Sequence, residues 1–176
     1  MNKLLLLGIA TLALLANAVT SFAQVCSPSV SGWTSPASAG ATIGANALTK
    51  YSIGSPFPSC LTFKPTATGT IIAHYDVVNT SVPNTQTPGW NTFEMGYDMP
   101  AGTTVMATLY QVTPCTGQVT PICVINGVAG DTCDCCFFNS GLNFFSFLYM
   151  VQVTLTRPNT NDQVPSVCTL RIYNSD

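Results

Sequence analysis

The segment Ile71-Ile72-Ala73-His74-Tyr75-Asp76-Val77-Val78 is the part of the sequence that decides the fold class. Its odd-numbered residues are apolar or aromatic, whereas the polar residues His74 and Asp76 fall on even positions. Because successive side chains of a β-strand point to opposite faces, one face of this segment suits a core and the other suits solvent. The pattern predicts a strand of an antiparallel sheet that is buried on one side.

Alternation of the same kind extends to both sides of this segment. Alternating or short apolar runs, bounded by turns rich in Pro, Gly and Asn, lie at 42–53, 60–64, 92–99, 103–112, 118–126, 151–156 and 168–173. Residues that favour helices are scarce, since Glu94 is the only glutamate in the chain. The sequence therefore predicts an all-β protein, an antiparallel β-sandwich or jelly roll of about eight or nine strands reinforced by disulfides.

The first 23 residues have the layout of a secretory signal peptide, with Lys3, an apolar run over 4–16 and a small-residue ending at Ser21-Phe22-Ala23. A membrane anchor is the alternative, but it needs about 20 unbroken apolar residues, and polar residues interrupt this run. We expect cleavage after Ala23, no membrane-spanning segment after it, and a secreted, extracellular or cell-surface protein. The rest then divides into an irregular N-terminal arm over 24–40 and a single β-sandwich domain over 41–176.

All eight cysteines follow the expected cleavage site. An even number in an exported chain indicates disulfide bonds and predicts complete pairing. The sequence leaves the pairing open, although Cys135 and Cys136 should bond different partners because a bridge between adjacent cysteines is strained. The predicted disulfide cysteines are Cys26, Cys60, Cys115, Cys123, Cys133, Cys135, Cys136 and Cys168.

The low charge of the chain excludes some functions and favours others. Only 7% of the residues are charged and the formal net charge is −2, so a nucleic acid would find no basic surface. A hydrophobic fraction of 47% argues against intrinsic disorder. Few charges are available to protect exposed strand edges, which favours association between copies. A Thr154→Lys substitution, on the solvent face of the 142–156 segment, should then weaken that association.

Candidates for catalysis are few. His74 and Asp76 share a strand face and could form a dyad, but the G-x-S-x-G turn that would present a serine nucleophile is absent. Glu94 and Asp98 would lie about 13 Å apart along a strand, beyond the roughly 5–9.5 Å separation of paired carboxylates in glycoside hydrolases. We therefore predict no enzymatic activity and no cofactor.

The segment 131–136, which holds three cysteines and two aspartates, is the one candidate for metal binding. Thiols oxidise in an exported protein, and the segment has neither a CxxC pair nor a nearby histidine, so disulfides are favoured over a bound metal. Asp131 and Asp134 could instead hold calcium, although the EF-hand spacing is absent, and this alternative stays open. No metal site is assigned.

Two tryptophans are candidate ligand contacts. Trp33 and Trp90 lie in or beside Gly- and Pro-rich loops, where an exposed ring could stack on a sugar or on a partner surface. The alternative interpretation is that both rings anchor loops to the core. The run 144–149 is more apolar than a half-buried strand requires, so it is either buried on both faces or in contact with another subunit.

Two motifs carry a family resemblance. The strand-turn-strand motif of bacterial pre-peptidase C-terminal domains and related secreted jelly rolls resembles the residues Phe63-Lys64-Pro65-Thr66-Ala67-Thr68-Gly69-Thr70-Ile71. The residues Thr108-Leu109-Tyr110, followed by Cys115-Thr116-Gly117, resemble the central strand of those domains and the cysteine turn after it. The aspartate that usually begins the second motif is absent. The resemblance implies a β-sandwich accessory module of extracellular proteins, used for binding or attachment rather than catalysis.

Together these features favour an exported structural or adhesive module that self-assembles into oligomers or fibres. The alternative is a secreted accessory module that binds an extracellular carbohydrate or protein. The expected partner is thus either a second copy of the chain or an extracellular glycan or protein. A small exported enzyme or toxin, supported only by His74 and Asp76, ranks last.

Overall fold

The computed structural model describes residues 32–44, 47–53, 59–80, 86–130 and 132–175, which form a β-protein with two very short helices. The helices are the 3-10 helix η1 (Ala37–Ala39) and α1 (Ala47–Lys50). The strands are β1 (Gly32–Pro36), β2 (Ala41–Ile43), β3 (Tyr51–Ile53), β4 (Leu61–Phe63), β5 (Gly69–Val77), β6 (Thr92–Asp98), β7 (Thr104–Val112), β8 (Val119–Asn126), β9 (Cys133–Phe137), β10 (Leu148–Arg157) and β11 (Ser166–Tyr173).

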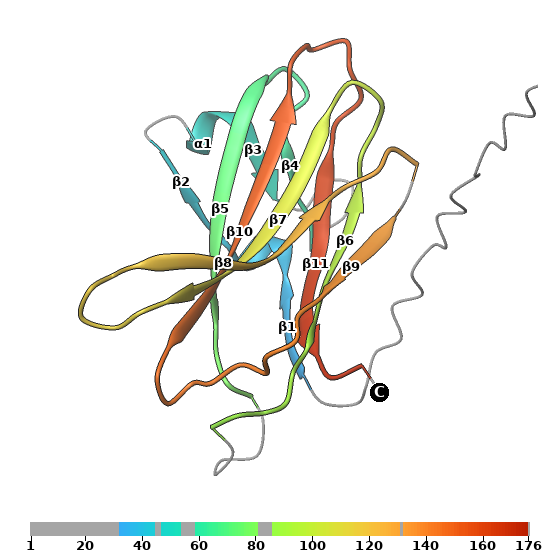
Figure 1. Ribbon diagram of the computed structural model, residues 1–176. Coiled ribbons are helices and arrows are strands. Elements are labelled where there is room, and N and C mark those ends of the chain that lie inside the picture. The colour runs from blue at the N-terminus through green and yellow to red at the C-terminus, as the bar shows by residue number, and fades with distance from the viewer. Residues whose placement is uncertain (1–31, 45–46, 54–58, 81–85, 131, 176) are drawn as a thin grey trace, which may run out of the picture.

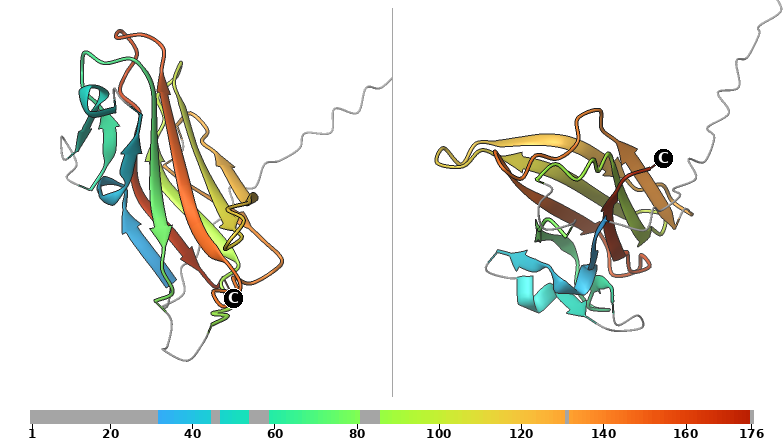
Figure 2. Two further views of the ribbon diagram at one scale, coloured as in Figure 1. Left: turned by 90° about the vertical axis from the view of Figure 1, so that its left-hand side faces the viewer. Right: turned by 90° about the horizontal axis from the view of Figure 1, so that it is seen from below.

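The strands form two antiparallel sheets that pack on each other as a sandwich (Figure 1, Figure 2). Sheet A has the order β3-β4-β11-β6-β9, and β1 also pairs with β11. Sheet B has the order β2-β5-β10-β7-β8. From β4 onward, most connections carry the chain from one sheet to the other, so neighbours within a sheet are distant in sequence. The predicted antiparallel β-sandwich is confirmed.

The core lies between the sheets and is filled by the alternating residues that the sequence singled out. On β5, residues 71, 73, 75 and 77 are all buried, whereas His74 is half-buried and Asp76 is exposed. Val153 of β10 lies opposite Ala73 of β5 on one side and Ala107 of β7 on the other, and none of the three is exposed. This central strand, with its period-two pattern, fixes which face of sheet B turns inward.

Two disulfides join cysteines that both lie in the described part of the chain. Cys60–Cys168 joins the residue before β4 to β11 within sheet A, and Cys123–Cys136 joins β8 of sheet B to β9 of sheet A. Cys135 is also disulfide-bonded, so the adjacent Cys135 and Cys136 do not bond each other. Cys26 lies outside the described residues.

Cys115 and Cys133 carry free, exposed thiols, so the prediction that all eight cysteines pair is wrong for these two. Cys115 belongs to the turn between β7 and β8, beyond the last strand pair of that hairpin, Val112 and Val119. Cys133 begins β9. Figures 1 and 2 show the tip of the β7–β8 hairpin projecting from the side of the molecule opposite to β9. The fold therefore keeps the two thiols apart.

The N-terminal boundary of the sandwich differs from the prediction. Residues 24–40 were expected to form an irregular arm, yet 32–36 are strand β1 of sheet A and pair with β11 from Tyr173 to Thr169. On β11, β4 pairs only with Ser166 and Val167, so β1 occupies the rest of that side of β11. The predicted signal peptide lies outside the described residues.

Other segments also depart from the expected strands. The segment 42–53 was expected to be one strand, but it contributes β2 to sheet B, then α1, then β3 to sheet A. The cysteine-rich segment, for which no strand was predicted, includes the edge strand β9. These additions raise the number of strands in the described residues to eleven, against the eight or nine expected.

Candidate functional site

A row of four polar residues crosses the outer face of sheet A. Each member is the cross-strand partner of the next, and the row runs Ser52 (β3), Thr62 (β4), Ser166 (β11) and Asp98 (β6). Three strand spacings of about 4.8 Å make the row about 14 Å long. Its neighbours along the strands, such as Phe63 and Val167, are buried in the core, so alternation turns the four polar side chains outward.

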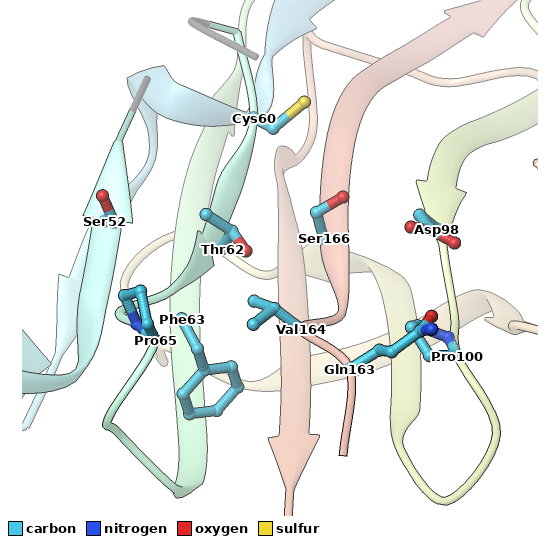
Figure 3. Close-up of a pocket in the computed structure, with 10 residues that line it drawn as sticks. All are labelled: Ser52, Cys60, Thr62, Phe63, Pro65, Asp98, Pro100, Gln163, Val164 and Ser166. Carbon is cyan, nitrogen blue, oxygen red and sulfur yellow. The ribbon is translucent and has the colours of Figure 1, made fainter. Parts of the chain in front are cut away.

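All four members of this row line a pocket of about 420 Å³. Figure 3 shows them side by side, with the disulfide-bonded Cys60 at one end of the pocket. The remaining lining residues come from the ends of the strands and the loops beyond them, and are Phe63, Pro65, Pro100, Gln163 and Val164. The volume falls within the range of roughly 300–1,000 Å³ that is usual for small-molecule sites. We call this the sheet A pocket.

Several polar groups of the pocket are unengaged within the described part of the chain. The Thr62 hydroxyl donates to the carbonyl of Pro165 at 3.0 Å and keeps its oxygen lone pairs for a further donor. Ser52, Asp98 and Gln163 make no side-chain hydrogen bond to other described residues. The pocket thus offers hydroxyl, carboxylate and amide groups to a ligand.

Among the described residues that line the pocket, Asp98 is the only charged one, and none is a Lys, Arg or His. An anionic ligand would therefore meet a negative charge with no cation to offset it. A neutral ligand with several hydroxyl groups suits the lining better, because Asp98 accepts hydrogen bonds and the serine and threonine hydroxyls both donate and accept. The side chains of Pro65, Pro100 and Val164 add apolar surface to the lining.

The two loops that border the pocket are held by one buried arginine. Arg157, 3% exposed, ends β10 and directs its guanidinium at backbone carbonyls of both loops. The acceptors are Asp162 (3.1 and 2.6 Å), Thr160 (2.7 Å), Pro65 (2.7 Å), Ala67 (3.1 Å) and Lys64 (3.4 Å). Pro65 on one loop, and Gln163 and Val164 on the other, line the pocket. Arg157 is thus a positioning residue for both walls.

A second polar cluster lies further along the outer face of sheet A. Glu94 of β6 is 6% exposed, accepts a hydrogen bond from the Tyr173 hydroxyl at 3.0 Å and pairs with Arg171 at 3.4 Å. Burial, and then the hydrogen bond and charge of Glu94, raise the pKa of Tyr173. The expectation that β6 has one face in solvent is wrong at Glu94, because the neighbouring β11 side chains cover it. With its partners satisfied, Glu94 is a structural carboxylate.

The tryptophans proposed as ligand contacts are buried. Trp33 is 4% exposed and lies on β1 opposite Ile172, and Trp90 is 1% exposed and meets Phe144 edge to face. Neither indole presents a face to a ligand, which corrects the assignment of Trp33 and Trp90 as candidate contacts. Both rings instead pack in the core, in keeping with the alternative interpretation as anchors.

The His74 and Asp76 dyad does not form. The His74 ring bonds the side-chain oxygen of Gln152, its cross-strand partner on β10, at 3.0 Å. Asp76 is exposed, and the ion pair found in the described residues joins Arg171 to Glu94. These residues therefore lack the hydrogen bond through which a carboxylate orients a catalytic histidine.

The described residues contain no cluster of three or more His, Cys, Asp or Glu side chains that could hold a metal ion. Asp131 lies outside them, and the Asp134 carboxylate accepts a hydrogen bond from the Cys135 backbone N–H at 2.8 Å. The described part of the chain also lacks a helix long and apolar enough to cross a membrane.

The polar row escaped sequence analysis because its members come from four segments far apart in the chain. Ser, Thr and Asp are common residues, and no spacing relates positions 52, 62, 98 and 166. The only available signal was alternation, which places Asp98 on the outward face of its strand. Knowing which strands are neighbours was necessary to bring the four together.

No protein-family model matches the sequence, and no curated protein does either. Among solved structures, the chain is similar to one described as carbohydrate-binding modules of the β-sandwich superfamily, at 12% identity and a TM-score of 0.46, over 82% of this chain and 56% of that one. It is also similar to the CBM22-1–GH10 modules of a Clostridium thermocellum xylanase complexed with xylohexaose, at 9% identity and a TM-score of 0.41. That match covers 86% of this chain and 26% of the xylanase chain.

Proposed function

We propose that this chain is an exported, non-catalytic binding module that holds a neutral, polyhydroxylated ligand of the carbohydrate class in the sheet A pocket. The observation that carries the proposal is the row of Ser52, Thr62, Ser166 and Asp98, which lines a pocket of about 420 Å³. Hydroxyl and carboxylate groups at regular strand spacing can pair with successive hydroxyl groups of a sugar.

The lining argues for binding without hydrolysis. Asp98 is the only carboxylate among the described residues that line the pocket, and Glu94, four residues away on β6, already bonds Tyr173 and Arg171. A glycoside hydrolase needs two carboxylates about 5–9.5 Å apart, whereas four strand residues separate these by about 13 Å. The disulfides are consistent with an oxidising compartment, which supports export.

The proposal is tested by screening soluble neutral glycans against the disulfide-bonded protein and measuring the affinity of each hit by calorimetry. Asp98→Ala should weaken binding about 10- to 100-fold, because a hydrogen bond to a charged group contributes about 1.5–3 kcal/mol. Ser166→Ala should weaken it less. Asp76→Asn is the matched control, since Asp76 is an exposed carboxylate on sheet B, outside the pocket.

Two results would overturn this proposal. One is a glycan that binds Asp98→Ala as tightly as the unmodified protein, and the other is binding of a peptide or a cation with no affinity for any neutral glycan.

A structural or adhesive role is the second candidate function. The observation that favours it is the chemistry of the outer face of sheet B.

A further inference from the structure

The outer face of sheet B is apolar to an unusual degree for a surface that the described residues leave uncovered. Ile43, Val119, Val124 and Leu148 point outward and are 48%, 46%, 45% and 62% exposed. They come from strands at both edges and the centre of the sheet. An outward sheet face in solvent is normally rich in polar side chains, and a large exposed apolar surface marks an interaction site.

The same face is almost free of charge. The five strands of sheet B contain two charged residues, the exposed Asp76 and the buried Arg157, whose guanidinium is engaged by the loops. Asp76 is therefore the one charge on the face. In contrast, the outward residues of sheet A include Asp98, Glu94 and Arg171. The two outer faces thus have different chemistry, and only that of sheet B suits an uncharged partner.

Two pairs of polar side chains on the face hydrogen-bond each other, one on the central part of β5 and β10 and one near the end of these strands. His74 bonds Gln152 at 3.0 Å, and Thr70 bonds Thr156 at 3.3 Å. Burying a polar group that already has a partner costs far less than burying one without. These residues therefore do not oppose the covering of the face by another apolar surface.

The size of the face matches a specific protein interface. Four strand spacings of about 4.8 Å make it about 19 Å wide, and its central strands of nine or ten residues are about 30 Å long. Because the edge strand β2 has only three residues, one copy offers about 480 Å², and two copies together offer about 1,000 Å². A biological interface should bury about 1,000 Å² or more, so nearly the whole face must take part.

We propose that the outer face of sheet B is the interface with a second copy of this chain, packed face to face about a two-fold axis. When two copies of this face meet, no groups of like charge are forced together, and the apolar residues of one copy can contact those of the other. Sheets stacked this way lie about 10 Å apart. The sheet A pockets of the two copies are then on opposite outer sides of the dimer and stay open.

Sedimentation analysis of the disulfide-bonded protein over a concentration series tests this inference. The unmodified protein should form a dimer. Val124→Lys and Leu148→Lys each place a charge in the interface at an exposed position, and should raise the dissociation constant at least about tenfold. Val128→Lys is the matched control, because Val128 is 53% exposed but lies in the loop after β8, where its backbone N–H donates to the Tyr97 hydroxyl of sheet A. It should leave the dimer unchanged.

Circular dichroism of each variant separates dissociation from unfolding, and either face variant alone suffices if the other fails to fold. A strict monomer at the highest soluble concentration would overturn the inference. A dimer or an open-ended polymer that persists in both folded face variants would also overturn it. The same holds if Val128→Lys raises the dissociation constant of the dimer as much as the face variants do. Because the pocket lies on the other sheet, Asp98→Ala should not alter dimerisation, and a failed glycan screen would leave this test intact.

Discussion

Replacing Arg157 with methionine should destabilise the protein and disturb the sheet A pocket together. The guanidinium makes six hydrogen bonds to five backbone carbonyls on two loops, while the arginine itself is 3% exposed. Methionine keeps most of the buried stem but donates nothing. Both loops then lose the bonds that fix them to the end of β10.

The magnitude follows from the shortest of these bonds. Those to Pro65, Thr160 and Asp162 are 2.7, 2.7 and 2.6 Å long, and at about 1.5 kcal/mol each they contribute about 4.5 kcal/mol. Carbonyls that regain water on the loop surface offset part of this loss, which leaves about 3 kcal/mol for Arg157→Met. Arg157→Lys keeps up to three donors and should cost about half as much.

Urea denaturation measures the free energy of unfolding of each variant, and a thermal scan should show a midpoint lower by roughly 6–12 °C for Arg157→Met. Lys64→Met is the control, because Lys64 is an exposed basic residue whose side chain makes a single bond, to the carbonyl of Leu48. It should cost less than about 1 kcal/mol. If Arg157→Met costs no more than Lys64→Met, the assignment of Arg157 as the residue that holds both loops is wrong.

Further predictions concern the disulfides, one thiol and one tyrosine. Replacing Cys60 and Cys168 by alanine should lower the free energy of unfolding by about 4.7 kcal/mol, whereas removing the Cys123–Cys136 disulfide should lower it by about 3 kcal/mol, because the first bridge closes the longer loop. Equal losses in urea denaturation would contradict this. Cys133 should react with iodoacetamide in the native protein, but only at a higher pH than a small free thiol, because burial and nearby negative charge raise the pKa of its thiol. Mass spectrometry of the alkylated peptide measures this reaction. Burial raises the pKa of Tyr75, whose hydroxyl donates a hydrogen bond to the carbonyl of Ala37. The stabilisation that Tyr75 provides is therefore complete below about pH 10, where tyrosine titrates in the unfolded chain. This stabilisation is lost as the pH rises further. Tyr75→Phe should therefore flatten the fall in stability above pH 10, and an unchanged slope would refute the assignment.

The sequence by itself determined the fold class, because alternation along a strand is a local property. The pattern at 71–78 specifies which side chains enter the core, and the structure places residues 71, 73, 75 and 77 there. Where a segment lacked such a pattern, the prediction failed. Residues 32–36 form a strand because β11 has an unpaired side that they fill, and nothing within those five residues signals that.

Only the tertiary structure decided the candidate site and the exposure of individual side chains. Trp90 lies beside a turn in the sequence, yet its ring is buried because the segment around Phe144 packs against it. Ser52 and Asp98 belong to one row because β4 and β11 lie between their strands, and strand order depends on the packing of the whole chain. A sequence records which face of each strand a residue occupies, whereas the identity of its neighbours is set by long-range pairing. The pocket exists only once that pairing is made.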